Sequence, residues 1–325
     1  MSREGFLGKY GWSIAHPVQG DVSPRRYFRV EKSGRKAILM DASAVEDKKQ
    51  VHDFVRIAKW LNDGGLKAPE IYEADEPHGF LLIEDMGDVS FRKAMESGVP
   101  ARDIYGLAND VLEHLRAAGC SLKLPDYYDS AIHMKRRFVI DWYVPLLRGE
   151  ENPPGLVESY LDVWDGIEKS LSPCPKGFVH ADYHLENMMW LPGEKGVKRC
   201  GLLDFQEALY GPVAYDLVNI LEDARMSVPL EIIGGILARQ DDLVRAWYRI
   251  LGTQFHCRVI GLFVKLAVHD GRRQYLVHVP RLAAYIEKGL EDPLLAPLRD
   301  WFKEQGISFD PQTAAEAVRR AQGQG

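Results

Sequence analysis

Two short strand-like runs, residues 187–191 and 200–204, constrain the fold of this chain more than any other feature. The residues between them are rich in turn formers, so the runs are expected to pair as a hairpin centred on Lys195 and Gly196. In that pairing Asn187 lies opposite Asp204, and directly opposed residues are about 5 Å apart. The pattern therefore predicts an amide and a carboxylate at one end of a β-ribbon.

A second carboxylate stands just upstream of this hairpin. Asp182 lies in the segment His180-Ala-Asp182-Tyr-His184-Leu-Glu-Asn187. A small number of hard oxygen ligands suits Mg²⁺ carried by the phosphates of a nucleotide better than it suits zinc. Phosphoryl transfer needs one carboxylate that orients the attacking hydroxyl, and an Asn and an Asp that hold the metal. The order of the three oxygen-bearing residues matches that requirement.

The motif His-x-Asp-x-x-x-x-Asn at 180–187, followed by Asp204 after an apolar pair, resembles a known catalytic loop. It is similar to that of the kinase-like aminoglycoside and choline phosphotransferases. The resemblance implies ATP and Mg²⁺ as cofactors and a hydroxyl group of a small molecule as the acceptor. By position, it implies that Asp182 is the catalytic base and that Asn187 and Asp204 bind Mg²⁺.

The resemblance also implies roles for residues around the loop. His180 and Asp216 would support the loop structurally, although Asp216 could instead be an N-cap at the helix start after Pro212. His184 could serve either the structure or the substrate. We expect His184, together with Tyr183 and Asp141, to line the substrate site.

The order of predicted elements agrees with a bilobal, protein-kinase-like α+β fold. Strands are expected at 27–31, 36–40, 70–74 and 80–84, with a helix over 46–61 between the two pairs. Long helical stretches follow at about 101–118, 129–148 and 154–171, then a β segment at 178–205, and helices again from residue 214. We therefore expect a small β-rich N-terminal lobe, residues 1–86, which binds nucleotide. A larger, mainly helical lobe, residues 87–325, would carry catalysis and substrate binding.

Other segments narrow the resemblance to one branch of this superfamily. The run from Gly20 to Arg29, the Leu203-Asp204-Phe205-Gln206 segment and the run from Gly211 to Leu217 resemble the bacterial anomeric amino-sugar kinases. Those enzymes phosphorylate the C1 hydroxyl of N-acetylmuramate and N-acetylglucosamine during cell-wall recycling. The resemblance thus implies an amino sugar as substrate, with an aminoglycoside or choline-type substrate as the near alternative.

The expected nucleotide site departs from the usual kinase pattern. The strand position that normally carries a phosphate-binding lysine holds Met40, so the charge is expected from Arg25 or Arg26, with Ser23 as a further phosphate contact. The hinge-like segment 82–86 implies nucleotide contacts from Glu84 and Met86. The acid of the first helix, which orients the lysine in such kinases, could be Glu46 or Asp53.

Two further classes of function remain open at this stage. His180, Asp182 and His184 alternate along the chain and could ligate a transition metal in a hydrolase. The missing lysine at Met40 would also fit a catalytically silent, nucleotide-binding pseudokinase.

Charge and composition limit the expected partners. The chain has 41 Lys and Arg against 47 Asp and Glu, which gives a net charge of −6 and argues against a general nucleic-acid binder. The four cysteines are far apart and the N-terminus has no apolar leader, so we expect a cytoplasmic protein with free thiols. No apolar run approaches the roughly 18 residues needed to cross a bilayer. A monomer or weak homodimer without membrane contact is expected.

Overall fold

The computed structural model describes residues 1–18, 25–46 and 48–323. The chain packs as two compact units: unit 1 is Met1–Lys123 with His180–Ala208, and unit 2 is Leu124–Val179 with Leu209–Gly325. The chain is 55% helix and 15% strand, and the N-terminal strands form an antiparallel sheet. These proportions confirm the predicted α+β class, with a β-rich N-terminal region and a mainly helical remainder.

The two units divide the chain differently from the predicted lobes. Residues 87–123 and 180–208 pack with the N-terminal sheet region in unit 1, although the predicted boundary assigns them to the larger lobe. The segment 180–208 therefore lies in the same unit as the strands expected to bind nucleotide. The lobe boundary at residue 86 stays a prediction about function, because the units describe only how the chain packs.

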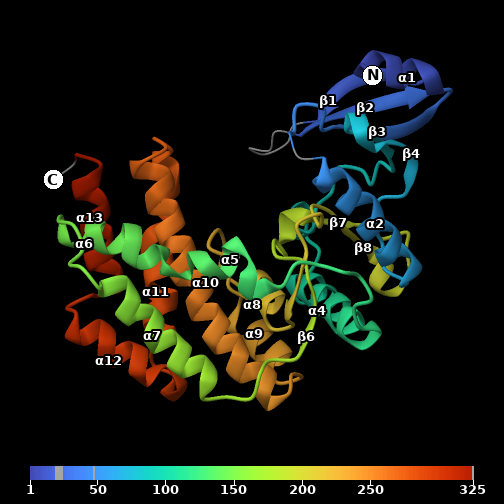
Figure 1. Ribbon diagram of the computed structural model, residues 1–325. Coiled ribbons are helices and arrows are strands. Elements are labelled where there is room, and N and C mark those ends of the chain that lie inside the picture. The colour runs from blue at the N-terminus through green and yellow to red at the C-terminus, as the bar shows by residue number, and fades with distance from the viewer. Residues whose placement is uncertain (19–24, 47, 324–325) are drawn as a thin grey trace. The chain divides into compact units, whose positions relative to one another are not determined.

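Unit 1 begins with a five-stranded sheet in the order β1-β2-β3-β5-β4, in which each neighbouring pair is antiparallel (Figure 1). The hairpin of β2 and β3 turns at Ser33 and Gly34, whose φ angles of 48° and 78° fit the tight turn that connects twisted strands. The predicted strand pairs are thereby confirmed. The five strands are β1 Ser13–Val18, β2 Arg26–Lys32, β3 Arg35–Asp41, β4 Ile71–Asp75 and β5 Phe80–Ile83.

The first helix and strand of the chain were not predicted. Helix α1, Arg3–Tyr10, buries Phe6 and Leu7 in a cluster with Val30, Leu39 and other sheet residues. Strand β1 is an edge strand, and nearly all its residues are exposed, so it lacks the alternation of apolar and polar residues that reveals a strand.

Three helices and a small hairpin complete unit 1. The hairpin of β7, Met188–Trp190, and β8, Cys200–Leu202, carries the predicted site, and Phe205 after β8 stacks on Phe54 of α2 at 4.8 Å between ring centroids. The three helices are α2 Lys49–Asp63, α3 Phe91–Glu96 and α4 Ala101–Ala118.

The register of the β7–β8 hairpin differs from the prediction by one residue. Met188 pairs with Leu202, so the amide of Leu203, not that of Asp204, bonds to the Asn187 carbonyl, at 2.9 Å. The strands are joined through a 3₁₀ turn at Gly196–Arg199 instead of a two-residue turn centred on Lys195 and Gly196. Asp204 has a φ of +59°, which lies in the left-handed region, so the extended conformation of β8 does not continue through Asp204.

Unit 2 is mostly helical, with one short sheet of two strands. The predicted helix over 129–148 is divided into short helical turns, including a π-helical turn at Val139–Tyr143. A Cβ on Gly261 of α10 would lie 2.1 Å from the Phe138 carbonyl oxygen, so glycine allows this helix to approach the irregular segment closely. The elements are α5 Ala131–Met134, α6 Val144–Arg148, α7 Leu156–Lys169, β6 Lys176–Val179, β9 Leu209–Pro212, α8 Tyr215–Leu221, α9 Leu230–Leu237, α10 Asp242–Val268, α11 Val279–Gly289, α12 Ala296–Glu304 and α13 Pro311–Ala321.

Helix α10 corrects one expectation about apolar runs. By length and composition it could span a membrane, whereas the sequence was expected to contain no such run. Most of its apolar window is buried within the protein, as in the central helix of a packed domain.

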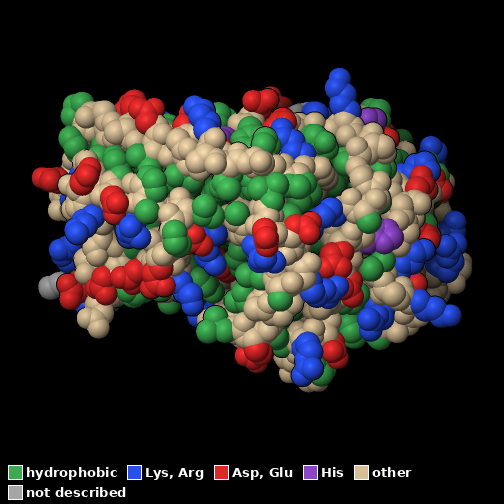
Figure 2. All heavy atoms as spheres, turned by 90° about the horizontal axis from the view of Figure 1, so that it is seen from below, with side chains coloured by type: hydrophobic (Ala, Val, Ile, Leu, Met, Phe, Trp, Pro, Cys, Tyr) green, Lys and Arg blue, Asp and Glu red, His purple; other side chains and the backbone are tan. Residues whose placement is uncertain are grey.

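On the face shown in Figure 2, basic and acidic side chains are interspersed, in keeping with the similar numbers of the two kinds.

Candidate functional site

The segment 180–187 forms a tight polar loop that ends in a 3₁₀ turn at Leu185–Asn187. The His184 side chain caps this turn by accepting the Glu186 amide at 3.3 Å. Ala181 has a φ of +74°, a conformation that costs a non-glycine residue about 1 to 3 kcal/mol. Only Ser33, Ala181 and Asp204 show a positive φ among the described non-glycine residues, and two of these flank the predicted site.

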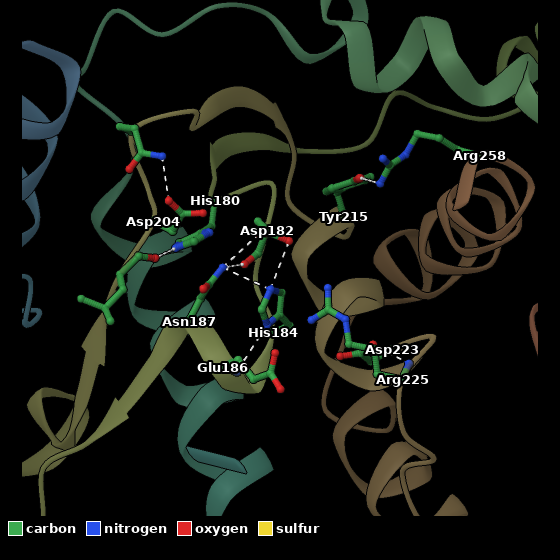
Figure 3. Close-up of polar contacts among 12 residues, drawn as sticks. His180, Asp182, His184, Glu186, Asn187, Asp204, Tyr215, Asp223, Arg225 and Arg258 are labelled. Atoms are coloured by element: carbon green, nitrogen blue, oxygen red, sulfur yellow. Dashed lines mark hydrogen bonds and ion pairs between the residues drawn. The ribbon is translucent and has the colours of Figure 1, made fainter. Parts of the chain in front are cut away.

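Asn187 is the centre of the polar contacts in this loop (Figure 3). Its amide nitrogen donates to the Asp182 carboxylate oxygen Oδ2 and to the Asp182 carbonyl, both at 3.0 Å. The same nitrogen lies 3.2 Å from Nε2 of His184. With its nitrogen directed to Asp182, Asn187 has its amide oxygen available as a ligand for a cation. The second Asp182 oxygen, Oδ1, lies 3.4 Å from Nε2 of His184, and the side chain remains 55% exposed, so the contacted carboxylate is still open to solvent.

Asp204 receives two hydrogen bonds on one carboxylate oxygen. Oδ1 accepts from Nη2 of Arg25 at 2.9 Å and from Nε2 of Gln206 at 2.9 Å. The Asp204 side chain is 38% exposed, whereas that of Arg25 is only 9% exposed. The structure therefore brings the predicted phosphate-binding arginine to the predicted metal ligand. Gln206 was not predicted to have a role, although it lies in a segment that carried the resemblance.

His180 and Tyr183 face inward from the loop. His180 Nε2 donates to the Leu203 carbonyl at 2.9 Å, and burial lowers the pKa of His180, so the ring is held neutral. This bond links the loop to the residue before Asp204 (Figure 3). Tyr183 is fully buried, and its hydroxyl donates to the Ala108 carbonyl of α4 at 2.9 Å. A fully buried Tyr183 does not fit direct contact with a substrate. Its hydrogen bond instead attaches the loop to α4.

Arg26, the other candidate phosphate-binding arginine, is paired with a different carboxylate. Arg26 pairs with Asp41 at 3.1 Å, and its side chain is 58% exposed. Met40 is buried in β3 between Tyr27 and Leu81, its register partners on the neighbouring strands. Ser23 lies outside the described residues.

The two candidate acids of the first helix, Asp53 and Glu46, differ in their surroundings. Asp53 is buried in α2 and pairs with Lys49 and Arg56 of the same helix, and these two cations help keep the pKa of Asp53 below its usual range although burial raises it. Glu46 is exposed before α2 begins. Because β3 carries Met40 and no lysine at this position, the structure does not choose between Asp53 and Glu46 as the acid that would orient a lysine.

The hinge-like segment lines a cavity of about 560 Å³ within unit 1. Glu84 and Met86 lie on one side of it and Trp190 and Leu191 of the β7–β8 hairpin on the other. Lys67 fixes the Glu84 carboxylate with contacts of 2.8 Å to both oxygens, and the Lys67 carbonyl accepts the Leu202 amide of β8 at 2.8 Å. The role of Lys67 was missed because no sequence motif marks a lysine that bridges two distant segments.

Two of the predicted site residues, Asp141 and Asp216, belong to unit 2. Asp141 is ion-paired with Arg137 at 2.8 Å and lines a cavity of about 810 Å³ with Trp142 and Arg273. Asp216 is buried in the first turn of α8, whose N-cap is Ala214, so Asp216 is not the N-cap. The substrate role of Asp141 and the bracing role of Asp216 stay predictions.

The residues of the loop fit a hard divalent cation better than a transition metal. Asn187 and Asp204 offer an amide oxygen and a partly exposed carboxylate, which are typical ligands for Mg²⁺. His180 is committed to a backbone carbonyl, and the described residues contain no group of three or more His, Cys, Asp or Glu side chains that could hold a metal ion. The hydrolase alternative therefore receives no support from the geometry.

Comparison with known proteins places the chain in a family. The profile of the family described as "Phosphotransferase enzyme family" matches residues 14–251. An N-acetylmuramate/N-acetylglucosamine kinase of Caulobacter vibrioides is 31% identical, over 93% of this chain and 95% of that protein. A kinase of the same name from Pseudomonas aeruginosa is 30% identical, over 87% of this chain and 86% of that protein.

Solved structures confirm the kinase-like fold. A thermostable mutant of the aminoglycoside phosphotransferase APH(4)-Ia superposes with a TM-score of 0.60 at 15% identity, over 89% of this chain and 99% of that chain. A choline/ethanolamine kinase family protein from Mesorhizobium loti gives a TM-score of 0.57 at 15% identity, over 94% of this chain and 92% of that chain. Because the family profile covers most of the sequence and the relatives align over nearly its whole length, the chain belongs to the phosphotransferase enzyme family and is a small-molecule kinase.

Proposed function

We propose that this kinase uses ATP and Mg²⁺ to phosphorylate the anomeric hydroxyl of an N-acetylated amino sugar, N-acetylmuramate or N-acetylglucosamine. The observation that carries the proposal is that two side-chain pairs in unit 1, Asp182 with Asn187 and Arg25 with Asp204, stand at one end of the β7–β8 hairpin. The bond from the Leu203 amide to the Asn187 carbonyl, at 2.9 Å, joins the two segments that carry these pairs. The names of the relatives, at about 30% identity over most of the chain, support the sugar as acceptor.

Asp182 is proposed as the base that orients the attacking hydroxyl. Its Oδ2 accepts the Asn187 amide at 3.0 Å, so the carboxylate has a fixed direction while most of the side chain stays accessible. A carboxylate that accepts the hydroxyl proton raises the nucleophilicity of the oxygen as the new bond to phosphorus forms. The strained φ of Ala181 adds support, since such conformations gather at functional sites.

Asn187 and Asp204 are proposed to hold Mg²⁺. The amide oxygen of Asn187 and the carboxylate of Asp204 are the oxygen donors that the loop and the hairpin present. When bound, the ion would neutralise charge on the phosphate oxygens. His180 positions Asp204 indirectly, because it holds the neighbouring Leu203 carbonyl.

The nucleotide is proposed to bind between the hinge-like segment and Asp204. Glu84 and Met86 line the cavity of about 560 Å³ in which the nucleobase of ATP would lie. Arg25 would contact the phosphates, because it is the guanidinium that reaches the predicted metal ligand. Met40 leaves β3 without the phosphate-binding lysine. In this proposal Arg25, the residue just before β2, supplies the positive charge instead. The pseudokinase alternative is thereby weakened.

The charge of the C-terminal segment, residues 251–325, favours an amino sugar over an aminoglycoside. Residues 251–325 carry ten Lys and Arg against eight Asp and Glu, a net charge of +2. Aminoglycosides are polycations and would be attracted by an acidic wall, whereas N-acetylmuramate carries a carboxylate. The aminoglycoside and choline kinases with similar structures are at most 17% identical, so they support the fold and not the substrate.

An ATP-consumption assay with a panel of acceptors tests the proposal. We expect turnover with N-acetylmuramate and N-acetylglucosamine, a dependence on Mg²⁺, and little turnover with aminoglycosides or choline. The methyl glycoside of N-acetylglucosamine is the matched control, because its anomeric oxygen is blocked while every other group is retained. Equal turnover of the free sugar and its methyl glycoside would contradict phosphorylation at the anomeric position. No turnover with either free amino sugar would contradict the proposed substrate class.

The cellular setting is part of the same proposal. We place the enzyme in the cytoplasm, in the recycling of cell-wall sugars, acting as a monomer or weak homodimer. Sedimentation of the purified protein measures its oligomeric state. A tight oligomer at micromolar concentration would contradict that last point.

A further inference from the structure

Arg25 stands in an unusual place for a phosphate-binding cation, because it is paired with the carboxylate proposed to hold the metal. Its Nη2 lies 2.9 Å from Asp204 Oδ1, and the guanidinium is nearly buried while the carboxylate is partly exposed. Gln206, a neutral donor, bonds to the same oxygen at 2.9 Å. Oδ1 therefore receives both protein donors, and one of them carries a full positive charge.

This arrangement affects a free cation and a nucleotide complex in opposite ways. Arginine stays protonated at any pH at which the protein is folded, so its charge is permanent. A free divalent cation approaching Asp204 meets a carboxylate whose charge is already largely balanced, and it is repelled by the guanidinium. A complex of the metal with a nucleoside triphosphate is negatively charged overall, and its phosphates are attracted by the same guanidinium.

We propose that Arg25 makes this site select the metal–nucleotide complex over the free divalent cation. The metal would then enter with the nucleotide instead of occupying Asp204 and Asn187 beforehand. This inference rests on the proposed function, because it assumes that Asp204 and Asn187 are the metal ligands. It adds a specificity role for Arg25 beyond a simple phosphate contact.

The neighbouring cations show why Arg25 is the residue assigned. Arg26 is the next residue in sequence, but it is committed to the buried carboxylate of Asp41 at 3.1 Å. Arg35 lies at the opposite end of the β2–β3 hairpin, where Lys32 is its register partner, and it is exposed. Replacing Arg35 removes one positive charge from the same hairpin without touching the site, so it is the matched control.

The test measures the binding of Mn²⁺ alone and of ATP in the presence of Mg²⁺, for the wild type and five variants. Electron paramagnetic resonance reports free Mn²⁺ directly, so the first readout does not depend on activity. For Arg25→Met we expect Mn²⁺ to bind roughly three- to tenfold more tightly than to the wild type. The same variant should bind ATP about 10- to 150-fold more weakly, the range given by the loss of one charged hydrogen bond.

The remaining variants separate charge from geometry. Arg25→Lys keeps the charge, so it should stay within about threefold of the wild type for Mn²⁺ and should recover part of the ATP affinity. Gln206→Leu removes the neutral donor, so Mn²⁺ should not bind more tightly. Arg35→Met should match the wild type in both measurements. Thermal unfolding checks that each variant is folded. If Arg25→Met does not fold, Arg25→Gln takes its place, because it also removes the charge but keeps a polar donor.

The possible results have distinct meanings. Weaker Mn²⁺ binding by Arg25→Met would overturn the proposal, because Arg25 would then position Asp204 for the metal instead of opposing it. An unchanged ratio of Mn²⁺ to ATP affinity would overturn it as well, as would finding the effect in Arg26→Met and not in Arg25→Met. If the wild type phosphorylates an amino sugar and these changes are absent, only this inference fails. If the wild type neither binds ATP nor turns over, the proposed function fails with it.

Discussion

The polar loop at 180–187 is held by contacts that are local in sequence, whereas Arg25, just before β2, reaches its partner over a long sequence distance. In the loop, Asn187 bonds to Asp182 and contacts His184, so the polar groups are held by near neighbours in sequence. From the edge of β2, Arg25 reaches Asp204, which is 179 positions away in sequence. The position on β3 at which the resemblance to kinases implies a lysine holds the buried Met40.

This difference shows which part of the site depends on local spacing in the sequence and which part depends on long-range packing. The negatively charged part depends on a local turn with a strained backbone, so its residues must keep their spacing. The positively charged part depends only on a cation that reaches the same point in space, and a neighbouring strand can supply it. Variants of the loop and variants of the positively charged part therefore test the two parts separately.

Asp182→Asn should break the local part of the site with the largest effect on turnover. The change removes the acceptor for the hydroxyl proton, so we expect kcat to fall by at least about 10²-fold. An asparagine oxygen can still accept the Asn187 amide, and the side chain is exposed, so folding and ATP affinity should be preserved. Steady-state kinetics with N-acetylglucosamine and calorimetry with ATP measure the two quantities. Near-normal kcat in the variant would remove Asp182 from the mechanism.

Asp204→Ala and Asn187→Ala should both raise the Mg²⁺ concentration needed for half-maximal turnover. We expect about tenfold or more for Asp204→Ala, because it removes a full negative charge, and less for Asn187→Ala. Titration of activity with Mg²⁺ at fixed ATP measures the shift. Asn187→Ala should also lower kcat, because the Asp182 carboxylate loses the donor that fixes its direction.

The double variant sharpens this test. If the two residues hold one ion, the double variant should lose less than the product of the single losses. Strict additivity would indicate that only one of them is a ligand.

Met40→Lys tests whether the positive charge can be returned to β3. Met40 is buried, Asp53 is already paired with Lys49 and Arg56, and Glu46 is exposed. A new ammonium at position 40 should therefore destabilise the protein by about 2 to 4 kcal/mol. Met40→Leu is the control and should cost less than about 1.5 kcal/mol. Denaturant unfolding measures both. A stable Met40→Lys protein that restores ATP binding to Arg25→Met would show that the phosphate site still lies at β3.

The same contrast explains how much was predictable from sequence. The β2–β3 hairpin, α2 and α4 follow from periodicity and turn residues, and the loop motif marks Asp182, Asn187 and Asp204 because its spacing is local. The β7–β8 register was wrong by one residue because the turn composition did not reveal the 3₁₀ turn at Gly196–Arg199. Strand β1 was missed because an exposed edge strand has no buried face to impose a pattern.

Side-chain contacts between distant segments were beyond prediction. The sequence offered Arg25 and Arg26 as equal candidates, and only the packing of the chain sends one to Asp204 and the other to Asp41. Tyr183 was expected at the substrate, but its fully buried ring lies against α4. Burial of a side chain next to a motif depends on the rest of the fold, so the motif alone does not reveal it.

Lys67→Met should give the smallest effect and tests whether distant contacts also tune the nucleotide site. Lys67 contacts both carboxylate oxygens of Glu84 at 2.8 Å, while its carbonyl accepts the amide of Leu202 two residues before Asp204. It therefore links the hinge-like segment to the hairpin that carries the proposed metal ligand. Methionine keeps the length of the side chain and the backbone bond but loses the ion pair.

We expect the KM for ATP to rise roughly two- to fivefold, the range for one partly exposed ion pair, with kcat and the KM for the sugar unchanged. Lys67→Arg should recover most of the affinity. Lys59→Met, which removes an exposed pair with Asp63 on α2, is the matched control and should leave both KM values unchanged. An equal rise in the KM for ATP and for the sugar would contradict a specific role at the hinge, because a general loosening of unit 1 affects both substrates. A fall in kcat alone would instead mean that Lys67 acts on the metal ligand through its bond to Leu202, and the distant contacts would then belong with the catalytic loop.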